Sequence, residues 1–362
     1  MLGKEEINRY SRHIILPEIG AEGQEKLKHA KVLVIGAGGL GCPVLQYLVC
    51  AGVGTIGIVD GDVVDETNLQ RQILFSPVDI GKFKAETAKR KLSALNPHCK
   101  LQAANCKLTS PNALEIIKDY DLVIDGSDNF PTRYLINDAC VILNKPLVFG
   151  SVFKFEGQIS VFNYKNGPTY RCLFPEPPQD SPNCSEIGVL GVLPGIIGTL
   201  MSGEALKIIL GIGELLSGKL FVFDSLTSQT NIISFDKNPV NSEITSLIDY
   251  ESFCRPKSVA VSEISLTDFK KLMEQKENIQ IIDVREPNEY SAFNIEGINI
   301  PLNELSKHTD KIRKDIPVII HCQRGNRSKI AIELLQKDFG FTNLRNLTGG
   351  IEAFTPSEFS VR

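Results

Sequence analysis

The sequence predicts an α/β protein in which a Rossmann-like, mainly parallel sheet is followed by a smaller α/β domain. Residues 31–60 contain a β-branched run, a glycine cluster, an apolar helical segment and a second β-branched run. Strand and helix patterns alternate through residue 150, which is typical of a parallel sheet. Because 362 residues are too many for one ordinary core, we expect a second domain.

The first of these features predicts a nucleotide site. Residues 31–35, KVLVI, have the pattern of a buried strand, and Gly36, Gly38 and Gly41 follow at G-x-G-x-x-G spacing. Glycines permit a tight turn and let backbone N–H groups approach a phosphate at a helix N-terminus. Asp60 ends the second strand, where a carboxylate can accept hydrogen bonds from a ribose. Alone, this motif indicates an NAD-dependent dehydrogenase as readily as any other nucleotide-binding protein.

Apolar periodicity and turn residues predict the other elements of the first domain. Short helices are expected within residues 7–27, and a helix over residues 84–95 that Asn96 and Pro97 end. Further strands are expected over 100–105, 122–125, 146–153, 158–163, 220–224 and 231–235, and helices over 133–143 and 195–210. The proline-rich residues 166–183 predict an irregular stretch.

A second α/β pattern begins after residue 262. The expected order is a helix over 266–275, a strand over 280–283, the loop REPNEY, a strand over 318–321, the loop CQRGNR and a helix over 328–338. The polar residues 236–262 lack periodicity and contain the most plausible boundary. The predicted organisation is one domain over 1–250, a linker over 251–262 and a second domain over 263–362.

Composition excludes several classes of protein. Hydrophobic residues make up 42% and charged residues 23%, as in a globular protein with a sizeable core. A net charge of −4 and a pI near 5.9 give no electrostatic case for nucleic acid. The start lacks an apolar signal core, and the longest apolar stretch, residues 188–201, contains Pro194 and four glycines, so no membrane span is expected. We expect a cytoplasmic protein whose nine cysteines are thiols.

From about Ile7 to Cys254 the chain resembles the HesA/MoeB/ThiF family, relatives of the ubiquitin-activating enzymes. The resemblance rests on five motifs in order: RYSRHIILPEIG, VLVIGAGGLG, the D-x-D-x-V-x-x-x-N-L-x-R-Q run of residues 60–72, DIGKFK and DGSDN. It implies ATP-dependent adenylation of the C-terminal glycine carboxylate of a small ubiquitin-like sulfur-carrier protein.

The resemblance also implies the residues of the adenylation site. A carboxylate that attacks an α-phosphate brings negative charges together, so the site must supply cations and a metal. Arg71 and Lys84 match the family positions that contact the ATP phosphates, with Asn68 beside them. Asp128 matches the aspartate taken to hold Mg²⁺, and Asn129 adjoins it. Taken singly, Arg71 and Lys84 could belong to a solvated basic face, and Asp128 to a turn at a strand end. Their joint occurrence argues against a dehydrogenase, which would need none of the three.

Three further residues carry over from the family pattern. Gly39 and Asp60 correspond to contacts with the phosphates and the ribose. Arg12 matches an arginine that reaches the partner subunit's nucleotide, which implies a homodimer.

Two sets of cysteines need separate interpretation. Cys184 occupies the place of the family's redox or acyl-accepting cysteine, although it could be an incidental loop thiol. Relatives often bind zinc through two C-x-x-C pairs. Here Cys172 remains, Thr169 stands in its partner's place, and near the second pair only Cys254 is left. Because tetrahedral zinc requires four ligands, we expect no zinc.

The last hundred residues resemble a single rhodanese (sulfurtransferase) domain through IIDVREPNEY, CQRGNRS and TGGIEAF, with Phe354 in place of the commoner tryptophan. Cys322 lies between a buried strand and a helix, where loop N–H groups and the helix dipole can stabilise a thiolate or persulfide. Arg327 closes the loop after four intervening residues, whereas cysteine phosphatases have five, and the smaller loop favours sulfur. We expect Asp283 and Arg285 to hold the loop.

Together the two resemblances imply a fused enzyme that uses ATP and Mg²⁺. The first domain would make a carrier acyl-adenylate, and the Cys322 persulfide, loaded by a donor such as a cysteine desulfurase, would convert it to a thiocarboxylate. The expected carrier is MoaD-like, for molybdopterin synthesis. A ThiS-like carrier for thiazole synthesis or another sulfur pathway, a non-catalytic scaffold and an NAD-dependent oxidoreductase are the alternatives.

Overall fold

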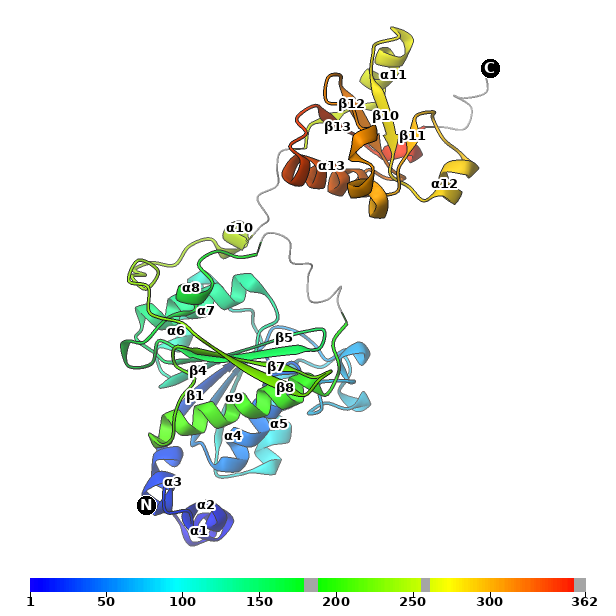
Figure 1. The fold of residues 1–362 in the computed structure, drawn as a ribbon. Helices are drawn as coiled ribbons and strands as arrows, with labels where there is room; N and C mark the ends of the chain where they lie inside the picture. Colours follow the sequence, from blue (N-terminus) through cyan, green and yellow to red (C-terminus); the bar gives the residue numbers. More distant parts are fainter. Residues whose placement is uncertain (179–187, 255–260, 355–362) are drawn as a thin grey trace. The chain divides into compact units, whose positions relative to one another are not determined.

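The computed structural model describes residues 1–178, 188–254 and 261–354 (Figure 1). The chain divides into two compact units, Met1–Arg255 and Pro256–Arg362, which are described separately.

Unit 1 is built on an eight-stranded sheet of order β3-β2-β1-β4-β5-β6-β7-β8. The parallel part comprises β1 (Lys31–Ile35), β2 (Thr55–Val59), β3 (Lys100–Ala104), β4 (Leu122–Asp125) and β5 (Leu147–Phe153). An antiparallel extension follows with β6 (Glu156–Phe162), β7 (Lys219–Asp224) and β8 (Gln229–Ser234). The predicted mainly parallel α/β class is therefore confirmed. The strand order reverses between β1 and β4, where doubly wound sheets bind ligands at the strands' carboxyl ends.

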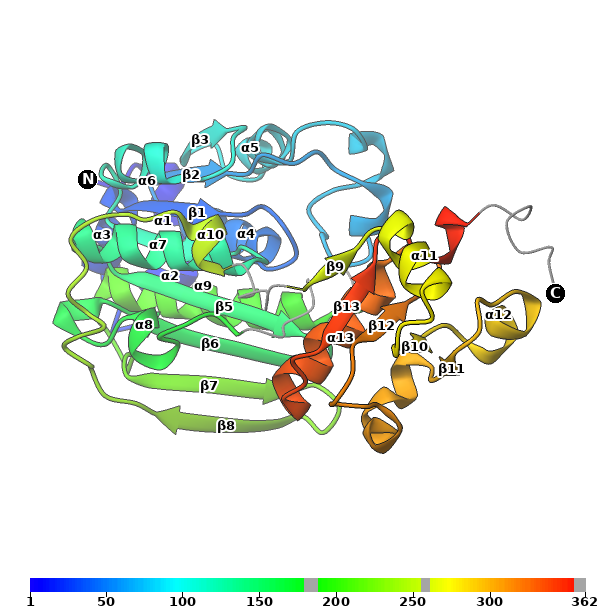
Figure 2. The same cartoon turned by 90° about the horizontal axis from the view of Figure 1, so that it is seen from above.

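Helices cover both faces of this sheet (Figure 2). The described helices of unit 1 are α1 (Lys4–Arg9), α2 (Ser11–Ile14), α3 (Gly20–His29), α4 (Gly41–Ala51), α5 (Lys84–Leu95), α6 (Ser110–Ile117), α7 (Phe130–Ile142), α8 (Tyr170–Leu173), α9 (Leu193–Leu210) and α10 (Tyr250–Cys254). Because successive strand residues point to opposite faces, β1 supplies two cores. Val32 and Val34 join the core of α4, α5 and α9, whereas Leu33 and Ile35 join that of α6 and α7.

Helix α9 is long and apolar enough, by length and composition, to cross a membrane, but 50% of its residues are buried inside unit 1. It packs against α4, β5 and β6. A side chain on Gly150 of β5 would overlap Met201, and one on Gly157 of β6 would overlap Ile197. The apolar character of α9 is therefore used for close packing on the sheet.

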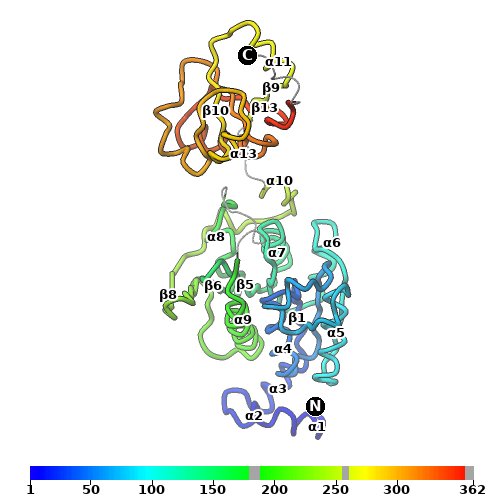
Figure 3. Tube along the Cα trace, turned by 90° about the vertical axis from the view of Figure 1, so that its right-hand side faces the viewer, coloured from blue at the N-terminus to red at the C-terminus, as the bar shows by residue number. Residues whose placement is uncertain are grey.

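Unit 2 is a five-stranded, wholly parallel sheet of order β11-β10-β12-β13-β9. Figure 3 traces its chain, with β9, β10 and β13 labelled. Its strands are β9 (Glu263–Ile264), β10 (Gln280–Asp283), β11 (Ile298–Asn299), β12 (Val318–His321) and β13 (Leu344–Leu347). Its helices are α11 (Leu266–Glu274), α12 (Pro287–Ala292) and α13 (Asn326–Phe339). Cores on the two faces of the sheet are formed by Ile282 and Ile320 on one side and by Ile281 and Ile319 on the other.

Two predicted loops were wrong in part. The REPNEY loop contains α12, which begins with Pro287 and is capped by Glu289, whose carboxylate accepts the Glu286 N–H at 3.0 Å. The proline-rich stretch after residue 166 contains α8, which Thr169 precedes as the N-cap residue. Both helices are too short for apolar periodicity to reveal them.

Candidate active sites

The glycine loop of unit 1 touches the loop after β4. Gly36 has φ +91°, and a Cβ there would lie 2.6 Å from the carbonyl oxygen of Gly126. A Cβ on Gly41 would overlap the Gly36 carbonyl oxygen. The glycines therefore let the β1 loop and the DGSDN loop meet at the carboxyl ends of β1 and β4, as the motif predicts.

Asp60 organises the glycine loop from β2. Its carboxylate accepts the N–H groups of Ala37 and Asp62, both at 2.8 Å. Burial raises the pKa of Asp60, although these N–H donors and nearby Lys84 act against the rise. Because each carboxylate oxygen can accept a second hydrogen bond, the contact with Ala37 leaves capacity for a ribose hydroxyl.

Two predicted cations lie beside this loop. Gly39 faces Arg71, whose Cγ would lie 3.5 Å from a Cβ at the glycine, and a Cβ on Gly38 would lie 3.7 Å from Gln72 Nε2. Lys84 begins α5, is 6% exposed, and its Nζ lies 3.3 Å from Asp62 Oδ2. The structure therefore brings both cations to the edge of the sheet that holds the glycine loop.

Asn68 lies three residues before the predicted Arg71, in the short 3₁₀ turn Glu66–Asn68. Its amide donates to Thr67 Oγ1 at 3.4 Å, and Arg71 Nη1 donates to the Thr67 carbonyl at 3.1 Å. The side chains of Asn68 and Arg71 are both half-buried.

A buried carboxylate that sequence analysis did not single out holds this segment in place. Asp79 of the DIGKFK motif is 0% exposed and accepts hydrogen bonds from Ser76 N (3.0 Å), Ser76 Oγ (2.8 Å) and Arg90 Nη2 (2.9 Å). It also pairs with Lys91, which donates to the Leu74 carbonyl at 3.0 Å. Burial acts to raise the pKa of Asp79, but Lys91 and Ser76 lower it to about 2. The carboxylate stays charged and fastens the segment before Lys84 to α5.

The turn after β4 presents Asp128 to solvent. Asp125 is buried and its Oδ1 accepts the Ser127 N–H (2.9 Å) and hydroxyl (2.6 Å). Asn129 caps α7 by accepting the Thr132 N–H at 2.9 Å, while its amide donates to Asp128 Oδ1 at 3.4 Å. Asp128 is thus an exposed carboxylate on a fixed turn, the kind of oxygen ligand that Mg²⁺ prefers.

Arg12 is not brought to this site within one chain. It is exposed on α2, and the preceding Tyr10 packs on Gly52 and accepts a hydrogen bond from Asn96 at 2.9 Å. Gly52 precedes β2 and Asn96 precedes β3, so this region lies at the amino ends of the strands, opposite the glycine loop (Figure 2).

The hydrogen-bond partners of Cys172 come from Thr169 and from a segment that the sequence analysis did not connect with it. The Cys172 sulfur accepts the N–H groups of Thr169 and Asn238, both at 3.3 Å, and lies 3.2 Å from Ser242 Oγ. Burial acts to raise the pKa of Cys172, but these hydrogen bonds lower it below its ordinary value. Cys254 lies on α10, where burial raises its pKa to about 11. The segment that faces Cys172 is therefore 238–242.

Within the described ranges, no group of three or more His, Cys, Asp or Glu side chains is placed to hold a metal. Cys184, which the sequence analysis also singled out, lies outside the described residues.

In unit 2, Cys322 lies at the carboxyl end of β12, and the loop 322–325 leads into α13. Its sulfur accepts the Gly325 N–H at 3.1 Å and lies 3.5 Å from Ser328 Oγ. Burial acts to raise the pKa of Cys322, but hydrogen bonds from Ser328, Arg324 and Gly325 lower it below its ordinary value. The loop thus favours a thiolate.

The TGGIEAF segment packs against this loop through its backbone. A side chain on Gly350, which has φ +60°, would overlap the Cys322 carbonyl oxygen. That oxygen instead accepts the Ile351 N–H at 2.8 Å, and the Gln323 carbonyl accepts the Glu352 N–H at 3.0 Å. The glycine is required for this close backbone approach.

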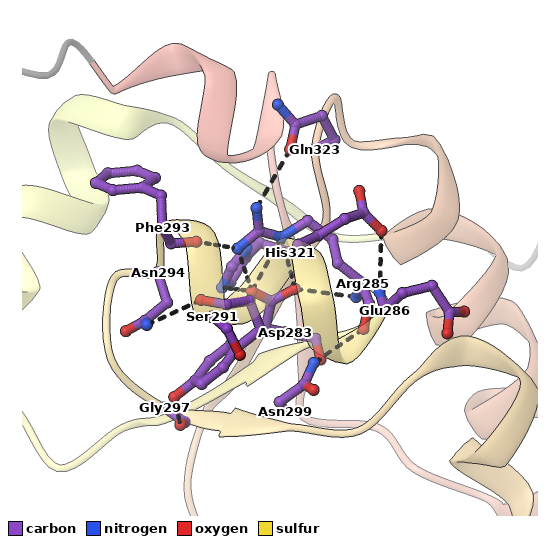
Figure 4. Close-up of polar contacts among 12 residues, drawn as sticks. Asp283, Arg285, Glu286, Ser291, Phe293, Asn294, Gly297, Asn299, His321 and Gln323 are labelled. Carbon is purple, nitrogen blue, oxygen red and sulfur yellow. Dashed lines mark hydrogen bonds and ion pairs between the residues drawn. The ribbon is translucent and has the colours of Figure 1, made fainter.

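Asp283 and Arg285 hold the loop from the side, as predicted (Figure 4). Arg285 Nη2 donates to Asp283 Oδ2 and to the Phe293 carbonyl, both at 2.6 Å, and its Nη1 donates to Gln323 Oε1 at 3.2 Å. His321 lies beneath them, with Nε2 3.8 Å from Asp283 Oδ2. Burial lowers the pKa of His321 to about 4, so the ring is neutral at pH 7.

Arg327 lies in the first turn of α13 and is tied to α12. Its guanidinium donates two hydrogen bonds of 2.7 Å to Glu289, and this pairing lowers the pKa of Glu289 to about 2. Beside the loop is an open hollow of about 720 Å³. It is lined by Arg285, Glu289, Ala292, Phe293, Gln323, Ile351, Glu352 and Phe354.

Comparison with known families agrees with this geometry. The ThiF family model matches residues 10–243, and the Rhodanese-like domain model matches residues 265–357. The chain therefore belongs to the ThiF family and carries a C-terminal rhodanese-like domain.

Individual relatives differ in how much of the chain they cover. The chain is similar to the probable adenylyltransferase/sulfurtransferase MoeZ of Mycobacterium tuberculosis, with 42% identity over 98% of this chain and 94% of the relative. A sulfur carrier protein adenylyltransferase of Thermus thermophilus is 53% identical over 69% of this chain and 97% of its own length. The crystal structure of Escherichia coli MccB with ATP superposes with a TM-score of 0.57 at 25% identity, covering 66% of this chain and 75% of that one. The chain is an enzyme of the adenylyltransferase/sulfurtransferase type.

Proposed function

We propose that this enzyme adenylates the C-terminal glycine of a small ubiquitin-like sulfur-carrier protein and converts it to a thiocarboxylate with sulfur carried by Cys322. One observation supports the proposal: two strand-to-helix loops of a single chain lie beside groups suited to an anion. In unit 1, Arg71 lies beside Gly39, Lys84 lies beside Asp62, and the loop that contains Asp128 meets the glycine loop at Gly36. In unit 2, the Gly325 N–H points at the sulfur of Cys322.

In the first step, a carboxylate oxygen of the carrier attacks the α-phosphorus of ATP, and the bond to the β-phosphate oxygen breaks. Pyrophosphate leaves with that electron pair. Arg71 and Lys84 offset the charge that accumulates, and the loop of Gly36, Gly38, Gly39 and Gly41 lets N–H groups approach the phosphates. Asp60 accepts from the ribose.

Asp128 and Asn129 would hold Mg²⁺. Their fit rests on the exposed carboxylate and on the Asn129 amide, which fixes one of its oxygens. When bound, the ion neutralises phosphate charge.

In the second step, the outer sulfur of a Cys322 persulfide attacks the acyl carbon of the adenylate, and the bond to AMP breaks. The product is an acyl disulfide between carrier and enzyme. A thiolate, which we assign to Cys184, then attacks the Cys322 sulfur, releasing the carrier thiocarboxylate and forming a Cys184–Cys322 disulfide. An external dithiol must reduce this disulfide before the next turnover.

The assembly and pathway complete the proposal. We place Arg12 at the nucleotide of the partner subunit in a homodimer. It matches a family arginine with that role, and in its own chain it lies at the amino ends of the strands, away from the glycine loop. The enzyme would work in the cytoplasm with a persulfide donor such as a cysteine desulfurase. A MoaD-like carrier for molybdopterin synthesis is our first choice, and a ThiS-like carrier is the alternative.

Carrier-dependent exchange of radiolabelled pyrophosphate into ATP tests the first step. We expect exchange with an intact carrier and none with a carrier that lacks its C-terminal glycine. Exchange that is independent of the carrier, or NAD binding in place of ATP, would contradict the proposal.

A further inference from the structure

Two buried polar side chains lie beneath the Cys322 loop. Ser328 on α13 and Asn346 on β13 are both 0% exposed. The Ser328 hydroxyl oxygen lies 2.6 Å from Asn346 Oδ1, 3.0 Å from the Gly325 carbonyl oxygen and 3.5 Å from Cys322 Sγ. A hydroxyl carries one proton, so it can donate to only one of these three acceptors at a time.

Asn346 supplies the second observation. Its Nδ2 is buried and makes no hydrogen bond of normal geometry within the described part of the chain. An unpaired amide in a dry site is costly, and rotation of the amide by half a turn exchanges its nitrogen and oxygen. In the rotated arrangement Asn346 donates to Ser328 Oγ, and the Ser328 proton is free to point at the sulfur.

We propose that Ser328 is a positioning residue for the Cys322 sulfur and that Asn346 sets the direction of its hydroxyl proton. The proton points to Asn346 when the sulfur is a neutral thiol and to Sγ when the sulfur is a thiolate or persulfide anion. No covalent bond changes in this rearrangement. The inference rests on the proposed role of Cys322 as the persulfide carrier.

The charged side chains near the sulfur are paired with one another, so we expect hydrogen bonds to stabilise its anionic form. Arg327 from α13 is engaged by Glu289, and Arg285 is engaged by Asp283 on β10. His321 on β12 is neutral because burial lowers its pKa to about 4. The arginines are thus charge-balanced, and an anionic sulfur depends on the donors that point at it.

Glu263 on β9 is the carboxylate that faces Asn346. Its pKa is lowered chiefly by a hydrogen bond from Lys329 on α13, with a smaller effect from Asn346. Lys329 approaches Glu263 to 2.7 Å, and the Thr348 hydroxyl donates to it at 3.3 Å. Glu263 therefore keeps its main partners when the amide turns over.

The pH dependence of Cys322 alkylation tests the proposal on the full-length enzyme. Mass spectrometry of the tryptic peptide 315–324, which contains Cys322 and no other cysteine, reports iodoacetamide modification. We expect Ser328→Ala to raise the midpoint by about one pH unit, because a hydrogen bond to an anion is lost. Ser328→Thr should restore the midpoint, and the exposed Ser291→Ala on α12 should not move it.

Asn346→Asp provides a variant that keeps Ser328. The carboxylate of this variant always accepts the Ser328 hydroxyl proton, so we expect the midpoint of Cys322 alkylation to rise. The double variant Ser328→Ala with Asn346→Asp should shift the midpoint by less than the sum of the two single shifts. Midpoints unchanged in both single variants, or fully additive shifts, would overturn the inference. If the shifts occur as expected but a persulfide donor never loads Cys322, the proposed function fails while the positioning role stands.

Discussion

In the proposed function both units bind an anion where a parallel strand passes into a helix, but the two loops differ in what they contain. In unit 1 the loop between β1 and α4 consists of residues 36–40, GAGGL, and contains no acid, base or nucleophile. The side chains that we propose for its chemistry lie on other segments, chiefly Asp60, Arg71, Lys84 and Asp128. In unit 2 the loop between β12 and α13 carries its own reactive atom, the sulfur of Cys322.

The difference follows from the size of the anion. A triphosphate needs several cations over an extended surface, so unit 1 depends on supports such as Asp79, which fastens a long segment to α5. A single sulfur needs only a few donors, and the neighbours of Cys322 serve to hold its short loop. We therefore expect that loss of a single charged side chain abolishes pyrophosphate exchange by unit 1. In unit 2, we expect that loss of a single hydrogen bond changes the pKa of Cys322.

The largest effect is expected for Asp128→Ala. Loss of the proposed metal-holding carboxylate should lower carrier-dependent pyrophosphate exchange at least about 10²-fold. The exposed Asp119→Ala in the same unit is the matched control. The Cys322 alkylation profile should be unchanged, and normal exchange by the Asp128 variant would contradict the assignment.

Mixing two inactive variants tests whether the nucleotide site is shared between the subunits of a dimer or lies within one subunit. Arg12→Ala and Lys84→Ala proteins should each exchange pyrophosphate poorly. A mixed dimer would have one site with both wild-type residues, so mixing should restore part of the activity. If mixing restores nothing although mass spectrometry verifies subunit exchange, Arg12 does not act across the dimer.

The buried histidine of unit 2 should make that unit sensitive to acid. The pKa of His321 is lowered from 6.5 to about 4 by burial, so the folded state favours the neutral ring. The resulting stability is present above pH 6.5 and is lost as the pH falls toward 4, by roughly 3 kcal/mol in all. Calorimetry from pH 7 to 4 should show a smaller loss for His321→Asn, and an equal loss would rule out His321 as the cause.

The smallest effect concerns Cys172, whose sulfur accepts hydrogen bonds from Thr169 and Asn238. Cys172→Ala should lower the free energy of unfolding by about 1 kcal/mol, and Cys172→Ser should lower it less. A chelator should leave the melting temperature unchanged. Metal analysis that finds one zinc per chain would contradict the expectation of a zinc-free enzyme.

Much of the fold was predictable because the strands have simple patterns. The β-branched runs over residues 122–125, 280–283 and 318–321 form strands with those bounds, and the periodic residues 84–95 form α5. The short strands β9 and β13 carried no such signal, since each depends on its neighbour in the sheet.

The position of a candidate site residue was predictable where one motif contains it, as for Asp60, Asp128 and Cys322, which follow β2, β4 and β12; their roles stay predictions. The side-chain contacts that join distant segments around the candidate sites were not predictable. Glu289 pairs with Arg327, Asn346 with Ser328, and Cys172 with residues 238–242. Such pairings depend on tertiary packing, and no local spacing in the sequence indicates them.

The mass of the carrier after incubation with ATP and a persulfide donor tests the central claim most directly, provided that free sulfide is excluded. We predict that the wild-type enzyme replaces one carrier oxygen by sulfur. Cys322→Ala should still adenylate the carrier but form no thiocarboxylate, and Asp128→Ala should do neither. Thiocarboxylate formed by Cys322→Ala at the wild-type rate would contradict the account.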